Sequence, residues 1–408
     1  MKFTIQTAFV REKKIKDGTR WQGVIEYTVP GSDKHKRFTE VFPATVKDKE
    51  QAQRRLKRLR DRAAKELTEK EEPRPIKLDA SMDVAEYVVQ ATRRRIITDK
   101  SEESTAYGYR FSLAHVQEGF AGIKLRDLKP AHVRDWIAGM VEQGLSPATI
   151  SKAFRLLKAA LDDAVDDDVI QGNPCSKRTV QLPAPRKEKP NVLDERGRAA
   201  LSALLSGIES TPLGVAANLA RFTGMRRGEI CALRWCDVDL DAATVSVSKS
   251  IGIKQGGCYL KEPKSEKGKR SIPIPNAFVS ILAAYRDAMH EEWASIARKS
   301  NGELNEREFL NLFVIGSLDG RYWNPTRLGK AWQALAESFN LKGSEGRVVT
   351  LHDLRHGFAT IAVANSDVKS TSSILGHSTA ALTMDVYAGD DEAAKRRTAE
   401  AVARAYGF

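Results

Sequence analysis

The chain has 408 residues and a formal net charge of +13, with 66 lysines and arginines against 53 aspartates and glutamates. This length exceeds what one ordinary hydrophobic core organises, so we expect three domains, and the basic balance favours a polyanionic partner such as nucleic acid. No apolar run is long enough to span a membrane and the N-terminus does not resemble a secretory signal, so we expect a cytoplasmic, nucleoid-associated protein with no membrane partner.

Most of the excess charge lies at the start of the chain, where residues 1–77 carry 21 basic and 12 acidic residues. Alternation of apolar residues over 20–29 (RWQGVIEYTV) predicts a small antiparallel sheet, and apolar residues at helical spacing predict a helix over 47–72. We expect a small α+β domain over 1–75, built from a three-stranded sheet and this helix. The basic residues of the helix form either a solvated face or a DNA-binding face. Their local excess favours DNA contact, through Arg54, Arg55, Arg58 and Arg62.

A second, all-α domain is expected over 78–175, where the pattern is helical almost throughout. Ser146 and Pro147 are typical of a helix N-cap and first turn, and Pro130 similarly opens the preceding helix. Proline and charge mark 176–190 as a linker, most clearly over 181–190. The remainder, 191–408, is expected to be a mainly helical α+β domain with strands at Ala243–Ser250, Cys258–Lys261 and Arg270–Ile274.

Residues that suit phosphodiester cleavage are spread through this last domain. Cleavage without a metal or nucleotide requires a nucleophile, cations on the non-bridging oxygens and an acid for the leaving alkoxide. The segment Thr223–Glu229 (TGMRRGE) presents Arg226 at a helix start, where Glu229 could orient its guanidinium. Taken alone, this motif is weak, and a surface ion pair is the more common explanation of it.

A second motif, Leu351–His356 (LHDLRH), places His352 and Arg355 on neighbouring positions of one helix face. His352 and His356 with Asp353 also resemble a zinc-binding helix, but the permanent charge of Arg355 and the lack of a third ligand argue against that reading. The four cysteines lack metal-ligand spacing, and we interpret them as reduced packing residues. We therefore expect no metal site.

The third motif is the segment Ile374–Ser378 (ILGHS), followed ten residues after His377 by Tyr387. A lone tyrosine in a helical stretch is usually a core residue. As a nucleophile it would need nearby cations or a hydrogen-bonded base, because its phenol is almost wholly protonated at neutral pH. Arg226, Arg355 and the histidines could supply both.

The order of these residues resembles the catalytic set of the tyrosine recombinase (phage integrase) family. The set comprises Arg226, a hairpin lysine, His352, Arg355, His377 and Tyr387. We assign the lysine to Lys264, with Lys261, Lys267 and Lys269 as neighbouring alternatives. The resemblance implies that Tyr387 attacks the phosphate to give a 3′-phosphotyrosine, and that Lys264 protonates the 5′-oxygen. No cofactor, metal or ATP is then required.

The resemblance extends over Asp79–Phe408 and implies a catalytic domain of the DNA breaking-rejoining type, a helical core-site-binding domain and an arm-site-binding domain at the N-terminus. It further implies a homotetramer on double-stranded DNA, with a C-terminal helix over 391–406 that packs on a neighbouring protomer. Integration or excision of a prophage or conjugative element is the expected function. A Xer-like resolvase, a type IB topoisomerase and a non-catalytic DNA-binding regulator are the alternatives. A host DNA-bending protein and an excision factor are further candidate partners.

Overall fold

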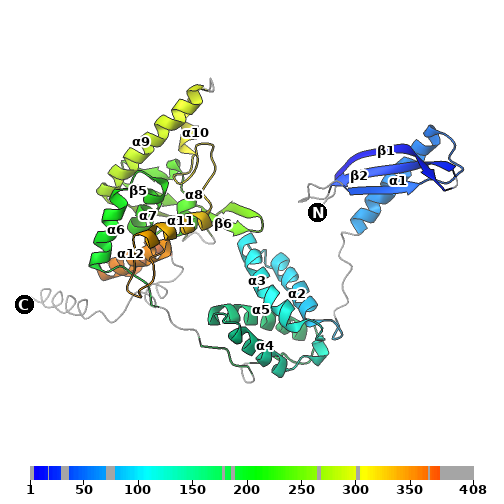
Figure 1. The fold of residues 1–408 in the computed structure, drawn as a ribbon, viewed down its shortest axis with the longest axis horizontal. Helices are drawn as coiled ribbons and strands as arrows, with labels where there is room; N and C mark the ends of the chain where they lie inside the picture. The colour runs from blue at the N-terminus through cyan, green and yellow to red at the C-terminus, as the bar shows by residue number, and fades with distance from the viewer. Residues whose placement is uncertain are drawn as a thin grey trace, which may run out of the picture. The chain divides into compact units, whose positions relative to one another are not determined.

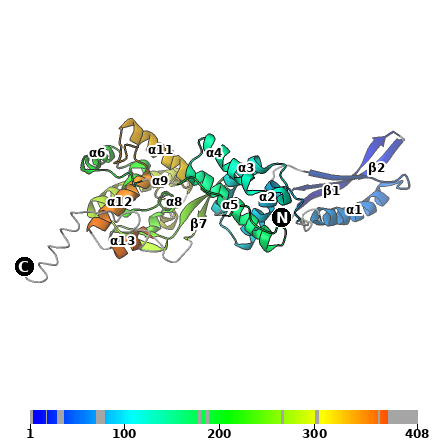
Figure 2. The ribbon, with the colours of Figure 1, turned by 90° about the horizontal axis from the view of Figure 1, so that it is seen from below.

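The computed structural model describes residues 4–16, 18–28, 36–69, 79–176, 180–184, 189–263, 268–299, 304–365 and 368–376. The chain divides into two compact units, Met1–Asp79 and Ala80–Phe408 (Figures 1 and 2). Each unit has its own architecture, and the larger one contains a helical part followed by a mixed part.

The smaller unit is an antiparallel sheet with one helix. Its strands are ordered β1-β2-β3, so that β2 is central, and the helix α1 packs on the sheet. Gly23 of β2 lies under the helix, where an added Cβ would come within 2.7 Å of Leu59. The expected three-stranded sheet and helix are confirmed, although the first strand had no clear signal in the sequence. The elements are β1 (Thr4–Ile15), β2 (Gly18–Thr28), β3 (Lys36–Val41) and α1 (Lys49–Glu69).

The helical part of the larger unit matches its sequence pattern closely. Ser146 caps α5, because its hydroxyl accepts a hydrogen bond from the Thr149 N–H at 3.2 Å, and Pro147 occupies the first turn. Pro130 begins α4 in the same way. The apolar stripe of α5 is buried against α2, α3 and α4. The helices are α2 (Val84–Thr98), α3 (Glu103–Phe120), α4 (Pro130–Glu142) and α5 (Pro147–Asp166), with a 3-10 turn at Leu125–Asp127.

The mixed part is organised around α7 (Pro212–Thr223), which is buried on nearly every side. It contacts α8 (Arg227–Ala232) and four longer helices, because small and apolar residues surround its axis. These neighbours and the remaining helices are α6 (Glu195–Ser206), α9 (Asn276–Lys299), α10 (Glu306–Leu310), α11 (Pro325–Ser338), α12 (Leu351–Asn365) and α13 (Val368–Leu375), with a 3-10 turn at Trp235–Asp237.

Two small antiparallel sheets complete this part. One has the order β4-β5-β8, and the other is the hairpin β6-β7. The single strand expected over Ala243–Ser250 was wrong in extent: β5 ends at Val247, and Ser250 begins a strand of the other sheet. The strand ends at Val247 because the chain leaves one sheet for the next. The strands are β4 (Val238–Asp239), β5 (Thr244–Val247), β6 (Ser250–Lys254), β7 (Gly257–Lys261) and β8 (Arg270–Pro273).

The four cysteines are free thiols and differ in environment. Cys175 and Cys231 are buried, and burial raises the pKa of each thiol to about 12, as expected for packing residues. Cys236 is exposed, so its interpretation as a packing residue was wrong. Among the residues that the structure describes, none of the helices is long and apolar enough to cross a membrane.

Candidate active site

Arg226 lies at the N-cap of α8, directly after the helix α7 has ended. Gly224 makes this change of direction possible, because it adopts the left-handed conformation at φ 63° as the C-cap of α7. The Arg226 guanidinium is 44% exposed and donates to Glu229 Oε1 at 2.9 Å and to the Gly376 carbonyl at 3.4 Å. One edge of this cation is therefore held while the rest faces solvent.

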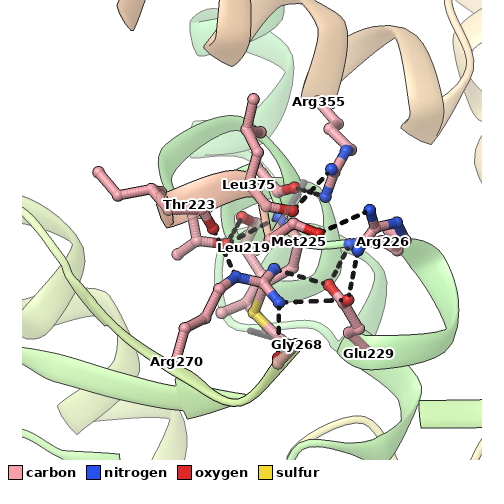
Figure 3. Close-up of polar contacts among 12 residues, drawn as sticks. Leu219, Thr223, Met225, Arg226, Glu229, Gly268, Arg270, Arg355 and Leu375 are labelled. Atoms are coloured by element: carbon pink, nitrogen blue, oxygen red, sulfur yellow. Dashed lines mark hydrogen bonds and ion pairs between the residues drawn. The ribbon is translucent and has the colours of Figure 1, made fainter. Parts of the chain in front are cut away.

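Glu229 is the anchor of Arg226, and its carboxylate is 92% buried. It accepts from the Arg226 backbone N–H at 2.8 Å and from Arg270 Nη2 at 2.9 Å (Figure 3). Burial alone would raise the pKa of Glu229, but the hydrogen bonds and charge of Arg270, followed by those of Arg226, outweigh it and lower the pKa. Glu229 is thus an anion held between two arginines.

Arg355 projects from α12 into the protein, and only 2% of the residue is exposed. Its Nη1 donates to the Gly224 carbonyl at 2.5 Å and its Nη2 to the Leu375 carbonyl at 2.9 Å (Figure 3). The guanidinium therefore joins the end of α7 to the end of α13. Because both terminal nitrogens of Arg355 donate hydrogen bonds to backbone carbonyls, the plane of the guanidinium is fixed.

His352 lies one turn before Arg355 on α12, and its side chain is exposed. Its ring packs edge-on against His356, with 4.4 Å between the ring centroids. Partial desolvation, then His356 and Arg355, lower the pKa of His352 to about 4, and desolvation also lowers the pKa of His356. Both rings are neutral at neutral pH, so His352 can accept a proton or a hydrogen bond there.

The alternative hypothesis, that His352 and His356 belong to a zinc-binding helix, gains no support from the described residues. The described residues contain no cluster of three histidine, cysteine or carboxylate side chains that could hold a metal ion. Arg355 directly precedes His356, and its buried guanidinium carries a permanent positive charge that would repel a metal dication. The two imidazoles instead contact one another edge to face.

Arg226 and His352 line one open cleft of about 720 Å³. Its walls also include Lys261 of the hairpin, Lys330 of α11 and Tyr107 of α3, so the helical and mixed parts of the larger unit both contribute. Lys261 Nζ lies 2.8 Å from a Glu102 carboxylate oxygen, which makes it a paired cation. The cleft presents an exposed guanidinium beside a neutral imidazole.

The other residues named from the sequence fall into two groups. The first group lies outside the described residues and comprises Lys264, His377, Tyr387 and the expected helix over 391–406. The structure describes the chain up to Pro263, again from Gly268, and finally up to Gly376. The arginines of α1 are exposed, and two of them are engaged: Arg54 with Glu50, and Arg62 with Glu40. The exposed face that the sequence predicts is there, and its DNA contacts remain a prediction for Arg54, Arg55, Arg58 and Arg62.

Arg270 is the residue of this site that the sequence did not single out. Its side chain is 5% exposed and reaches Glu229, the Gly268 carbonyl at 3.3 Å and the Ile374 carbonyl at 2.5 Å. In the sequence it stands at the start of a short strand among other basic residues, so it was indistinguishable from a solvated lysine or arginine. Two of its partners, Glu229 and Ile374, lie 41 and 104 residues away in the chain, so the local sequence pattern gives no signal of them.

Two family models match the larger unit. Residues 198–393 match the phage integrase family, and residues 83–180 match the phage integrase SAM-like domain. The chain is 24% identical over 277 residues to a XerC-like tyrosine recombinase of Caldanaerobacter subterraneus, which is 65% of this chain and 68% of that protein. It is 23% identical over 274 residues to the ICEBs1 integrase of Bacillus subtilis, which is 67% of this chain and 70% of that protein.

Solved structures share the fold at low sequence identity. An integrase of transposon Tn1549, in complex with transposon right end DNA, has a TM-score of 0.62 and 23% identity, over 79% of this chain and all of that one. A lambda integrase tetramer bound to a Holliday junction has a TM-score of 0.53 and 17% identity, over 90% of this chain and 95% of that one. The fold is therefore that of multidomain integrases.

Proposed function

The chain belongs to the phage integrase family and is a tyrosine recombinase, and on that premise we propose that it integrates and excises a mobile element through a covalent bond between Tyr387 and DNA. The observation that supports this most directly is the placement of Arg226, Arg355 and His352. The first two are oriented by buried partners, and the exposed edge of Arg226 shares a cleft with His352.

The two arginines would bind the scissile phosphate. A planar guanidinium bonds two phosphate oxygens at once and keeps its charge at every relevant pH, so it stabilises the charge that builds on the non-bridging oxygens. Glu229 holds Arg226 by side chain and backbone, and two carbonyls hold Arg355. Cations fixed in this way need little reorganisation when the reaction begins.

The bond between phosphorus and the 5′-oxygen breaks as the tyrosine oxygen bonds to phosphorus. The phenolic proton of Tyr387 requires an acceptor, and His352 is neutral at neutral pH, which suits it to that task. The departing 5′-oxygen requires a proton, which we assign to Lys264. Lys261, an alternative at the end of β7, is paired with Glu102, and this favours Lys264. His377 would hydrogen-bond the phosphate.

The ester preserves the energy of the phosphodiester, so a 5′-hydroxyl of the partner DNA can reseal the strand without ATP. Strand exchange between two sites needs four protomers, and we propose a homotetramer on double-stranded DNA. Domain roles follow the expectations from the sequence: 1–75 binds arm sites, 78–175 binds core sites, and 191–408 carries the chemistry after the linker 176–190. The matches of 83–180 and 198–393 to the two family models support this division.

Covalent capture tests the proposal. Wild type and Tyr387→Phe are expressed beside the ends of the element, denatured rapidly and recovered, and the attached DNA is sequenced. Attachment at one discrete sequence through a 3′-phosphate, absent in Tyr387→Phe, is the expected result. Attachment scattered over DNA would indicate a topoisomerase, and no attachment where DNA binding is demonstrable would indicate a regulator without chemistry.

A further inference from the structure

Three successive carbonyl oxygens at the end of α13 accept hydrogen bonds from three different arginines. Ile374 accepts from Arg270, Leu375 from Arg355 and Gly376 from Arg226. Gly376 turns the chain at φ 64°, and an added Cβ there would lie 3.0 Å from Arg270 Nη1. Three cations therefore hold the turn 374–376, which comes directly before His377 in the chain.

Arg270 differs from Arg226 in being buried, and from Arg355 in having a carboxylate among its hydrogen-bond partners. Its side chain is 5% exposed, whereas Arg226 is 44% exposed. A buried cation is costly unless it is paired and hydrogen-bonded, and Arg270 has Glu229 as its carboxylate partner. It cannot reach a phosphate in the cleft without leaving these partners, so its contribution to the reaction is indirect.

The partners of Arg270 come from three segments that lie close in the chain to proposed catalytic groups. Glu229 holds Arg226, Gly268 follows Lys264 by four residues, and Ile374 precedes His377 by three residues. Arg270 Nε donates to the Ile374 carbonyl, and Nη2 donates to the Glu229 carboxylate. Nη1 donates to both the Gly268 carbonyl and the Glu229 carboxylate. Only a planar fork spans such a set, because a lysine concentrates its donors on one atom.

We propose that Arg270 is a positioning residue of the recombination reaction, which fixes the Arg226–Glu229 pair and the turn 374–376 relative to one another. This inference rests on the proposed function of Arg226. Displacing a phosphate-binding cation by about 1 Å is enough to cost about 100-fold in rate. Loss of Arg270 therefore slows the chemical step while DNA binding by the rest of the chain is retained.

The test compares Arg270→Lys with wild type in single-turnover cleavage, on core-site DNA found by covalent capture and nicked to trap the adduct. Arg321→Lys is the matched control, because Arg321 also pairs with a carboxylate, Asp319, but is 82% exposed on the surface. Each protein is measured on a natural scissile phosphate and on a methylphosphonate, which has no charge for Arg226 to neutralise. DNA affinity and thermal melting are recorded in parallel.

We expect Arg270→Lys to cleave the natural phosphate about 100-fold more slowly than wild type, which is the loss typical of a misplaced catalytic group. Its affinity for core-site DNA, and the cleavage rate of the Arg321→Lys control, should be close to wild type. On methylphosphonate the ratio of variant to wild-type rate should recover by about tenfold or more, because the misplaced cation matters less there. A purely structural defect would lower both rates equally.

Cleavage of the natural phosphate close to the wild-type rate, or equal losses on both substrates, would overturn the role of Arg270 while leaving the recombinase intact. If Arg270→Lys does not fold, Glu229→Gln tests the same link from its other end, by the same two criteria. Absence of any adduct with the wild type would instead overturn the proposed function itself.

Discussion

Gly224→Ala should destabilise the larger unit and disturb the candidate site together. Gly224 has φ 63°, and an added Cβ would lie 2.6 Å from Phe358 Cδ1 and 2.8 Å from Leu375 Cδ2. Its carbonyl also accepts the hydrogen bond from Arg355 Nη1. A methyl group at this position therefore pushes on α12 and α13 at the place where they hold the cation.

Two effects lower the free energy of unfolding of Gly224→Ala. An alanine in the left-handed region loses about 1–2 kcal/mol, and an extra carbon in a packed core costs about 1–3 kcal/mol more. The expected loss in the free energy of unfolding is therefore roughly 2–5 kcal/mol. Gly320→Ala is the matched control, because Gly320 has φ 82° but nothing lies within 4 Å of an added Cβ. It should lose only the conformational part, about 1–2 kcal/mol.

Urea denaturation of both variants measures the two losses, and covalent-adduct formation on core-site DNA measures the site. Gly224→Ala should be the less stable variant and should form adduct more slowly in conditions where it remains folded, while Gly320→Ala reacts as wild type. Equal stabilities for the two variants would refute the packing argument. Normal adduct formation by folded Gly224→Ala would refute the link between this glycine and Arg355.

The remaining predictions concern a helix cap, a histidine and the α1 surface. Ser146→Ala removes the side-chain acceptor of the Thr149 N–H and should cost about 1 kcal/mol in urea denaturation, whereas unchanged stability would show that the cap contributes nothing. Because the pKa of His352 is lowered to about 4, the unfolded chain binds a proton between about pH 6.5 and pH 4 that the folded chain does not, and stability falls as pH drops through that window. His352→Asn should therefore lose less stability than wild type when thermal melting is compared at pH 7 and pH 4.5; equal losses would contradict the shift. Replacing Arg55 and Arg58 with Gln should weaken DNA binding and reduce the slope of log affinity against log salt by about two, and an unchanged slope would mean that neither residue contacts phosphate.

Helix boundaries in the larger unit were predictable because their signals are local. Ser146 and Pro147 begin α5, and Pro130 begins α4, through hydrogen bonds and backbone angles that involve only the first turn. The strand limits near Ser250 were wrong, because β-branched residues stand on both sides of the boundary between two sheets, at Val247 and at Ile251. Which sheet a short strand joins depends on partners distant in sequence.

The sequence by itself determined the chemical groups and their order along the chain: Arg226, Lys264, His352, Arg355, His377 and Tyr387 are present in an order that a family shares. Only the tertiary structure decided that Arg270 joins Glu229 to the turn at Ile374. It also decided that the pKa of Glu229 is lowered despite burial. The physical reason is the separation along the chain over which each kind of interaction acts. Caps and periodic patterns act within a few residues. The desolvation and hydrogen bonds of a buried arginine depend on segments that packing brings together from far apart in the chain, as it does Arg270 and Ile374, which are separated by 104 residues.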